Sequence, residues 1–246
     1  MAWLPTQIKQ TGLLVFRPVS QQKGMVSLNV GETVVRETEE EKLLGLVIDN
    51  KLKWNSHILQ LQNQLNQRTA VLRRLKQWLP RDCLSLVAQG LVFSKMRYGL
   101  PLYGQPRLLE SDPLTNHCKC LQVTVNNIMR MLTRNRLSDK VPIRDLHAST
   151  GLPSLNQMVV QAILVETWKI MHNESGIEHS IFQKVDSVTR AASEGEVKLP
   201  KKTNGNGAGF VYNGAKIWNM APLDIRLAGN LASAKRKIKA FAELYQ

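Results

Sequence analysis

Residues 42–104 read KLLGLVIDNKLKWNSHILQLQNQLNQRTAVLRRLKQWLPRDCLSLVAQGLVFSKMRYGLPLYG, and the rest of the chain is arranged around them. The apolar run at 43–48 predicts a strand that ends in a turn at Asp49-Asn50. Two earlier apolar segments predict further strands, so residues 1–53 are expected to form a small antiparallel β region. Strands of this length need a helix or more strands to cover them, and the first residues are too few to supply either. We therefore expect the chain to begin as part of a larger domain.

A helical hairpin is predicted over residues 54–104. In its first helix, at 54–79, apolar residues recur at steps of three and four, with one interruption at Arg68. Pro80 and an expected N-cap at Asp82 open the second helix, which is almost wholly apolar and is expected to pack on the first. The outer face of the first helix is basic, which fits either a solvated surface or a surface that binds a polyanion.

The remaining residues predict a helical bundle at 105–180 and a basic segment at 210–246. A Ser-x-x-Gln capping box at 154–157 begins one of the bundle helices. The segment between, 181–209, is polar and rich in Gly, Asn and Lys, which predicts a flexible linker. The clearest core-facing stripe repeats at alternating steps of four and three, and its residues are Leu114, Cys118, Leu121, Val125, Ile128 and Leu132. Together the segments predict an α+β fold that is mainly helical.

The charge of the chain points to a polyanionic partner. It has 33 Lys and Arg residues against 19 Asp and Glu residues, for a net charge of +14. Nucleic acid is the commonest partner of such a chain; a basic surface that serves solubility alone is the alternative. Two clusters supply the predicted contacts, and they are Arg68, Arg73, Arg74 and Lys76 in the first helix, then Arg130, Arg134, Arg136 and Lys140 further on.

The sequence also bears on the compartment. No apolar window of eighteen residues predicts a membrane span, and no secretory signal is recognisable at the N-terminus. Three cysteines, an odd number, suggest a reduced chain without a disulfide framework. We therefore expect an intracellular protein, cytoplasmic, nuclear or both, whose oligomeric state is open. The run His117-Cys118-Lys119-Cys120 lacks the second ligand pair of a zinc site, so its cysteines are interpreted as core residues.

Four blocks of residues are spaced along nearly the whole chain. They are LGLVIDNKLKWNSHI at 44–58, LPRD with YGLPLYG between 79 and 104, LQVTVNNIMR at 121–130, and a tail of Thr189-Arg190, Leu199-Pro200 and GAKIWNMAP at 214–222. In order and spacing they resemble the reverse transcriptases of non-LTR (LINE-type) retrotransposons. The resemblance covers the C-terminal part of such enzymes, from the end of the palm through the thumb to a C-terminal extension.

The resemblance implies a residual palm and primer-grip region at 1–53, a thumb hairpin at 54–104 and then the helical bundle. Leu44 and Gly45 fall on the primer grip, a hairpin that positions the primer 3′ end. The lysine that the family carries after its catalytic strand falls on Gln10, which departs from the pattern. The basic clusters would hold an RNA–DNA heteroduplex by its shape and phosphates, without reading its sequence.

No catalytic residue is predicted in the chain. The family's catalytic carboxylates, which hold two metal ions, lie upstream of the first residue, and the sequence has no Asp-Asp pair. The run Glu39-Glu40-Glu41 is interpreted as a solvated cluster, so no cofactor is expected and Mg²⁺ would belong to the missing palm. Three interpretations stay open: an inactive fragment that holds a template–primer duplex, part of an active RNA-directed DNA polymerase whose N-terminal half lies outside the chain, and a degenerate structural remnant.

Overall fold

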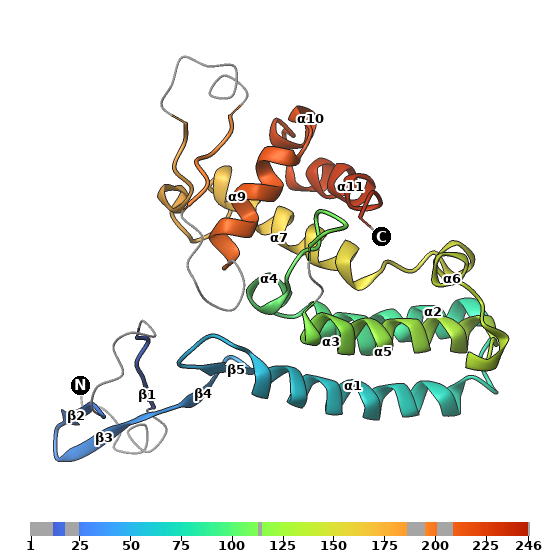
Figure 1. The fold of residues 1–246 in the computed structure, drawn as a ribbon, viewed down its shortest axis with the longest axis horizontal. Helices are drawn as coiled ribbons and strands as arrows, with labels where there is room; N and C mark the ends of the chain where they lie inside the picture. Colours follow the sequence, from blue (N-terminus) through green and yellow to red (C-terminus); the bar gives the residue numbers. More distant parts are fainter. Residues whose placement is uncertain (1–11, 18–24, 113–114, 186–194, 201–208, 246) are drawn as a thin grey trace. The chain divides into compact units, whose positions relative to one another are not determined.

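The computed structural model describes residues 12–17, 25–112, 115–185, 195–200 and 209–245. These residues form a mixed α and β protein that is mainly helical, with the small β part at the N-terminal side, as predicted (Figure 1). The chain divides into two compact units, Met1–Leu61 and Gln62–Gln246. Helix α1 (Asn55–Leu75) contributes its first residues to one unit and the rest to the other.

The described residues of the first unit include five short strands. They are β1 (Leu13–Leu14), β2 (Ser27–Val30), β3 (Thr33–Thr38), β4 (Glu40–Leu43) and β5 (Leu46–Asp49). β2 pairs with β3 and β4 with β5, each as an antiparallel hairpin. β1 pairs with β3 in the parallel direction, with Leu13 opposite Glu37. The predicted antiparallel arrangement therefore holds for the two hairpins, with β1 as the exception.

The apolar run at 43–48, predicted as one strand, is divided between β4 and β5 by a two-residue turn. Leu44 and Gly45 form this turn with φ angles of 49° and 84°. Positive φ at both central residues gives the tight hairpin turn that matches the right-handed twist of the flanking strands. The single-strand prediction is wrong because Leu-Gly lacks the Asn-Gly or Asp-Gly signal by which such turns are recognised.

Asp49 organises the loop between β5 and α1. Its carboxylate accepts hydrogen bonds from the backbone N–H groups of Lys51 and Lys53, both at 3.0 Å, and of Trp54 at 2.7 Å. Leu52 and Trp54 have positive φ angles of 52° and 62°, which residues with a side chain adopt only at a cost. The carboxylate therefore stabilises a backbone path that the loop would not favour by itself, and the predicted turn is confirmed.

The first turns of α1 are attached to the second hairpin by side chains. The Val47 N–H donates to Nδ1 of His57 at 3.4 Å. The rings of Trp54 and His57 meet edge to face with their centroids 6.0 Å apart. The Ser56 hydroxyl donates to the Glu40 carboxylate of β4. The LGLVIDNKLKWNSHI block thus encodes a junction between a hairpin and a helix.

The acidic residues of β3 and β4 are held by hydrogen bonds. Arg17 donates to both carboxylate oxygens of Glu37, at 2.5 and 2.6 Å, and the Val26 N–H donates to the same group at 3.1 Å. The bonds from Arg17, followed by that from Val26, lower the pKa of the Glu37 carboxyl. Glu41 accepts a hydrogen bond from the Thr38 hydroxyl at 2.8 Å. The acidic run is therefore partly engaged in the sheet, and is not the fully solvated cluster that was predicted.

The second unit is helical. Its helices of eight residues or more beyond α1 are α2 (Arg81–Ala88), α5 (Asn116–Thr133), α6 (Ile143–Thr150), α7 (Leu155–Met171), α9 (Phe210–Met220) and α11 (Leu231–Ala242). The shorter ones are the π-helical η2 (Gln89–Phe93), α3 (Ser94–Arg97), α4 (Leu100–Tyr103), η3 (Leu137–Asp139), η4 (His179–Ile181) and α10 (Leu223–Arg226). α7 lies at the centre of this unit, in contact with α4, α5, α9 and α11 (Figure 1).

The predicted helical hairpin is present, with different ends. α1 stops at Leu75, four residues before the predicted end. Pro80 occupies the N-cap position of α2, so the predicted cap at Asp82 is wrong. Asp82 instead lies in the first turn, where its charge complements the helix dipole. The predicted stripe of α1 is confirmed at its buried residues, which are Ile58, Leu61, Leu65 and Leu72.

The second helix of the hairpin continues from α2 through η2 into α3. Its residues Leu84, Ala88, Val92 and Met96 are all buried and recur every four residues. This repeat is longer than the 3.6-residue period of an α-helix. Three regular turns take up about eleven residues, so a twelve-residue span carries one residue too many. The π-turn η2 absorbs this extra residue and keeps the four side chains on the core side.

The sequence patterns predicted for the bundle are largely confirmed. The capping box of α7 is formed: the Gln157 N–H donates to Ser154 Oγ at 3.1 Å, and the Ser154 N–H donates to Gln157 Oε1 at 2.8 Å. Leu114 of the predicted stripe lies outside the described residues. The rest of the stripe is buried in α5, at Cys118, Leu121, Val125, Ile128 and Leu132.

Part of the predicted linker at 181–209 packs against α9. The Asn219 side chain accepts from the Val197 N–H at 3.0 Å and donates to the Val197 carbonyl at 2.8 Å. Trp218 Nε1 donates to the carbonyl of Gly195 at 3.0 Å. Val197 itself is buried. These described residues are therefore held by α9, in contrast to the flexible linker that was predicted for the segment.

Replacing Asp49 with Ala removes the acceptor of three backbone N–H groups. We expect the free energy of unfolding to fall by about 2 kcal/mol, because hydrogen bonds to a charged group are stronger than neutral ones. Urea denaturation measures the change. The neighbouring substitution Asn50→Ala is the control and should stay within about 0.5 kcal/mol of the unchanged chain. Equal losses for the two variants would contradict the role of the carboxylate.

Leu44→Asn should stabilise the chain by about 1 kcal/mol. Asparagine adopts positive φ more readily than leucine, and the Leu44 side chain is 81% exposed, so little apolar burial is lost. Thermal and urea denaturation provide the measurement. Gly45→Ala, which places a Cβ on a residue with positive φ, should instead destabilise the chain. If Leu44→Asn destabilised the chain, the conclusion that Leu44 strains this turn would be wrong.

Candidate nucleic-acid interface

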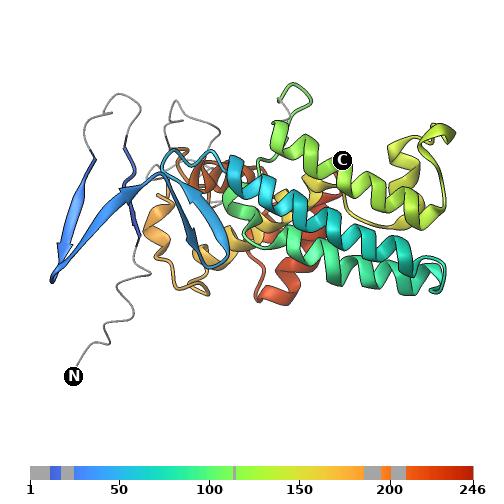
Figure 2. The ribbon, with the colours of Figure 1, turned by 90° about the horizontal axis from the view of Figure 1, so that it is seen from below.

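Seven of the predicted cations come together at one end of the second unit. They lie at the C-terminal end of α1, in the last turn of α5 and in the segment that follows α5. Figures 1 and 2 both place these segments beside the start of α2 and α6, and α5 contacts both α2 and α6. We call residues 73–82 and 130–147 the basic end. Within it Lys and Arg outnumber Asp and Glu by nine to three.

The cations of the basic end are available to an anion. Arg73, Arg74, Arg134, Arg136 and Lys140 are exposed, while the two other predicted cations are half-buried. In the part of the chain that the structure describes, none of these seven side chains forms an ion pair. The backbone N–H of Arg136 donates a hydrogen bond to the Asp139 carboxylate at 2.6 Å. This bond does not use the Arg136 side chain, so the guanidinium group stays uncommitted.

Two of these cations occupy unusual backbone positions. Arg134 ends α5 with a φ of 60°, and Lys140 ends η3 with a φ of 48°. Glycine commonly fills such left-handed positions at the ends of helices, because any Cβ raises the energy there. Strained residues of this kind cluster at functional sites. The chain thus keeps a positive charge at two places where glycine would fold at lower cost.

Arg68 is the predicted cation that does not join the basic end. It is half-buried, and its Nη1 donates to the carbonyl oxygen of Leu91 in η2 at 2.6 Å. This bond connects α1 to the π-turn of the second helix. The contact explains why Arg68 interrupts the apolar stripe of α1 and gives the residue a packing role. Its predicted contact with phosphate stays a prediction.

Trp78 and Arg81 belong to the basic end and were missed as site residues. Trp78 lies in the loop between α1 and α2 and is 77% exposed. An exposed aromatic ring among cations is the arrangement on which nucleic-acid bases stack. Arg81 donates to the carbonyl of Ser149 and so connects α2 with the end of α6. The interleaved run RRLKQWLPR carries this signal in the sequence, although the helix predicted over 54–79 gave Trp78 no role of its own.

The predicted primer-grip residues, Leu44 and Gly45, form the tip of the β4–β5 hairpin in the first unit. The primer-grip role that the resemblance implies for this hairpin stays a prediction. Its tip presents an apolar side chain that is largely exposed, on a turn that strains it. This tip and the basic end belong to different units, so we treat them as separate surfaces.

The described ranges also bear on metal binding, on the cysteines and on membrane insertion. They contain no group of three or more His, Cys, Asp and Glu side chains that could hold a metal ion. Cys118 is buried, with its Sγ 3.7 Å from the Gln105 carbonyl, which confirms it as a core residue. Cys120 is half-buried and Cys83 exposed. None of the helices described there has the length and apolar character needed to cross a bilayer.

Comparison with known proteins found no family model, no curated protein and no solved structure that matches the chain. The resemblance to non-LTR reverse transcriptases therefore rests on the four sequence blocks.

Arg68→Gln tests whether this residue is structural. It removes the hydrogen bond to the Leu91 carbonyl, so the free energy of unfolding should fall by about 1.5–3 kcal/mol. Arg73→Gln, five residues further along α1 and exposed, serves as the matched control and should leave stability unchanged within about 0.5 kcal/mol. Urea denaturation compares the two. If both variants were as stable as the original chain, the Arg68 contact would contribute nothing.

Proposed function

We propose that the chain binds nucleic acid through the basic end and holds a template–primer duplex, as the thumb part of a non-LTR reverse transcriptase would. The observation that carries this proposal is the gathering of exposed cations from three separate segments at one end of the second unit, in the basic end that also contains the exposed Trp78. Cations scattered over the surface for solubility alone would not converge on one end of a helical unit.

The chemistry of the basic end suits a phosphate backbone. Its nearest groups are guanidinium and ammonium groups on flexible stems, which neutralise phosphates and release counterions. None of these groups is arranged to distinguish one base from another, so the binding is expected to follow duplex shape and charge.

Trp78 adds a contact that a purely electrostatic surface lacks. A base stacked on its ring would stabilise a complex only where a base is accessible, at a single-stranded overhang or at the end of a duplex. A template–primer duplex has such an overhang. The proposal therefore assigns Trp78 to the unpaired template bases and the surrounding cations to the phosphates.

The proposed function is limited to binding. Polymerisation requires carboxylates that hold two metal ions, and no such set was predicted in this chain. If the chain is part of a longer, active polymerase, the same surface would hold the duplex during synthesis. The tip at Leu44 and Gly45 would then contact the primer strand, as the resemblance implies.

A salt titration tests the electrostatic part of the proposal. Fluorescence anisotropy with a labelled RNA–DNA heteroduplex of about 20 base pairs should show binding near 50 mM salt. If about four phosphates are neutralised, the slope of log K against log salt should be about −3.6. Binding that is absent near 50 mM salt, or independent of salt, would overturn the proposal.

Matched variants locate the binding surface. Arg73→Gln with Arg74→Gln, and Arg134→Gln with Arg136→Gln, should each make the salt slope less steep by about two. Arg236→Gln with Lys237→Gln removes the same charge from α11, outside the basic end, and is the control. Trp78→Ala should weaken an overhanging duplex more than a blunt one, with the slope unchanged. Equal effects of all charge variants would mean that net charge alone drives binding.

A further inference from the structure

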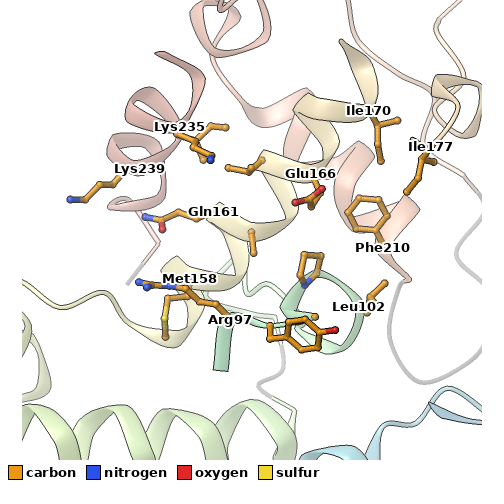
Figure 3. A pocket seen from close by; sticks show the side chains of 16 residues that line it. Arg97, Leu102, Met158, Gln161, Glu166, Ile170, Ile177, Phe210, Lys235 and Lys239 are labelled. Atoms are coloured by element: carbon orange, nitrogen blue, oxygen red, sulfur yellow. The ribbon is translucent and has the colours of Figure 1, made fainter. Parts of the chain in front are cut away.

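A cavity of about 850 Å³ opens in the second unit, outside the basic end. Its walls come from α3, α4, α7, α9 and α11 (Figure 3). The volume lies within the range of pockets that bind small molecules, which are mostly apolar with a few polar groups. Nothing in the proposed nucleic-acid function uses this cavity.

The lining of the cavity is divided into an apolar part and a cationic part. Figure 3 shows Leu102, Ile170, Ile177 and Phe210 on one side and Arg97, Lys235 and Lys239 with Gln161 on the other. Leu102 and Ile177 are about half exposed, at 50% and 51%. Because burial of exposed apolar side chains is favourable, a ligand that covers them would bind more tightly.

The charges of the lining are not balanced within it. Glu166 is its one acidic residue, and it pairs with Lys169 at 2.8 Å, which does not line the cavity. Lys235 and Lys239 lie one turn apart on α11 and are exposed. Neither forms an ion pair or a hydrogen bond with any residue that the structure describes. Arg97 faces them from α3 across the cavity (Figure 3).

We propose that this cavity binds a small amphipathic anion. The aliphatic or aromatic body of the ligand occupies the side of Leu102, Ile177 and Phe210. Its carboxylate or other oxyanion lies between Arg97 and the lysines of α11. The combination of an apolar floor and an uncompensated cationic edge selects this class of ligand, because a purely ionic ligand leaves the apolar side uncovered and an uncharged one leaves the cations unused.

Dodecanoate, kept below its micelle concentration, is the probe for the first experiment. Isothermal titration calorimetry should show one bound dodecanoate per chain, and the melting temperature should rise with ligand concentration. Dodecanol, which has the chain without the charge, should bind about tenfold more weakly. Acetate, which has the charge without the chain, should not bind. Equal affinities for dodecanoate and dodecanol, or binding seen only with micelles, would overturn the proposal.

Variants then assign the contacts. Lys235→Gln with Lys239→Gln should weaken dodecanoate about tenfold while dodecanol binding stays the same. Arg236→Gln with Lys237→Gln removes equal charge from the same helix but not from the lining, and should leave dodecanoate binding intact. Ala162→Phe, which fills part of the cavity from α7, should abolish binding of both ligands, with circular dichroism confirming the fold.

A competition experiment separates this site from the basic end. The labelled heteroduplex should not displace dodecanoate, and Arg73→Gln with Arg74→Gln should not change the affinity for dodecanoate. Displacement by the duplex would assign Lys235 and Lys239 to a nucleic-acid surface instead and overturn the proposed site. Failure of duplex binding with dodecanoate binding retained would refute the proposed function only.

Discussion

The burial of α7 is the constraint on which the second unit depends. This helix is apolar on nearly all sides, and Met158, Ile163 and Trp168 are among its fully buried side chains, so it is stable only when other helices surround it. The surrounding helices approach closely enough to require glycine. A Cβ on Gly214 of α9 would lie 2.7 Å from Thr167 Oγ1, and one on Gly104 would lie 3.0 Å from a Val159 methyl group. The apolar side of the cavity is the part of this arrangement that none of the described helices covers.

The helical part of the fold could be predicted from the sequence, because helix periodicity and caps are local signals. The stripes of α1 and α5 and the Ser154–Gln157 capping box are of this kind. The features that were missed depend on contacts across the fold or on uncommon turn chemistry. Leu44 adopts a positive φ that leucine rarely takes. Phe182 and Val197 looked like linker residues in a polar segment, yet both are buried, because the partners that cover them lie elsewhere in the chain.

In the candidate site, too, local features could be predicted from the sequence and features that depend on tertiary packing could not. Its cations were recognisable by type, but their convergence follows from the packing of α1, α2, α5 and α6, and sequence spacing does not reveal it. Arg68 and Trp78 illustrate the point: Arg68 donates a hydrogen bond to the Leu91 carbonyl, whereas Trp78 is exposed to solvent. The residues that carry the family resemblance have mainly structural tasks. Asp49 caps a loop, and Asn219 holds Val197 in place. The sequence blocks that carry the resemblance therefore lie largely where structural elements are connected. The proposed binding surface lies mostly outside these blocks.

The π-turn in the second helix of the hairpin also bears on how this gene can change. Leu84 and Ala88 precede the turn and Val92 and Met96 follow it, and all four keep their places in the core although one extra residue lies between the two pairs. A codon lost at this point would leave a spacing of about eleven residues between Leu84 and Met96, which three regular α-helical turns accommodate, so the apolar face would stay on the core side. Gly90, whose missing Cβ faces open space, lies inside this segment. The π-turn is therefore the position in this helix where the loss of one residue would keep the four buried side chains aligned with the core.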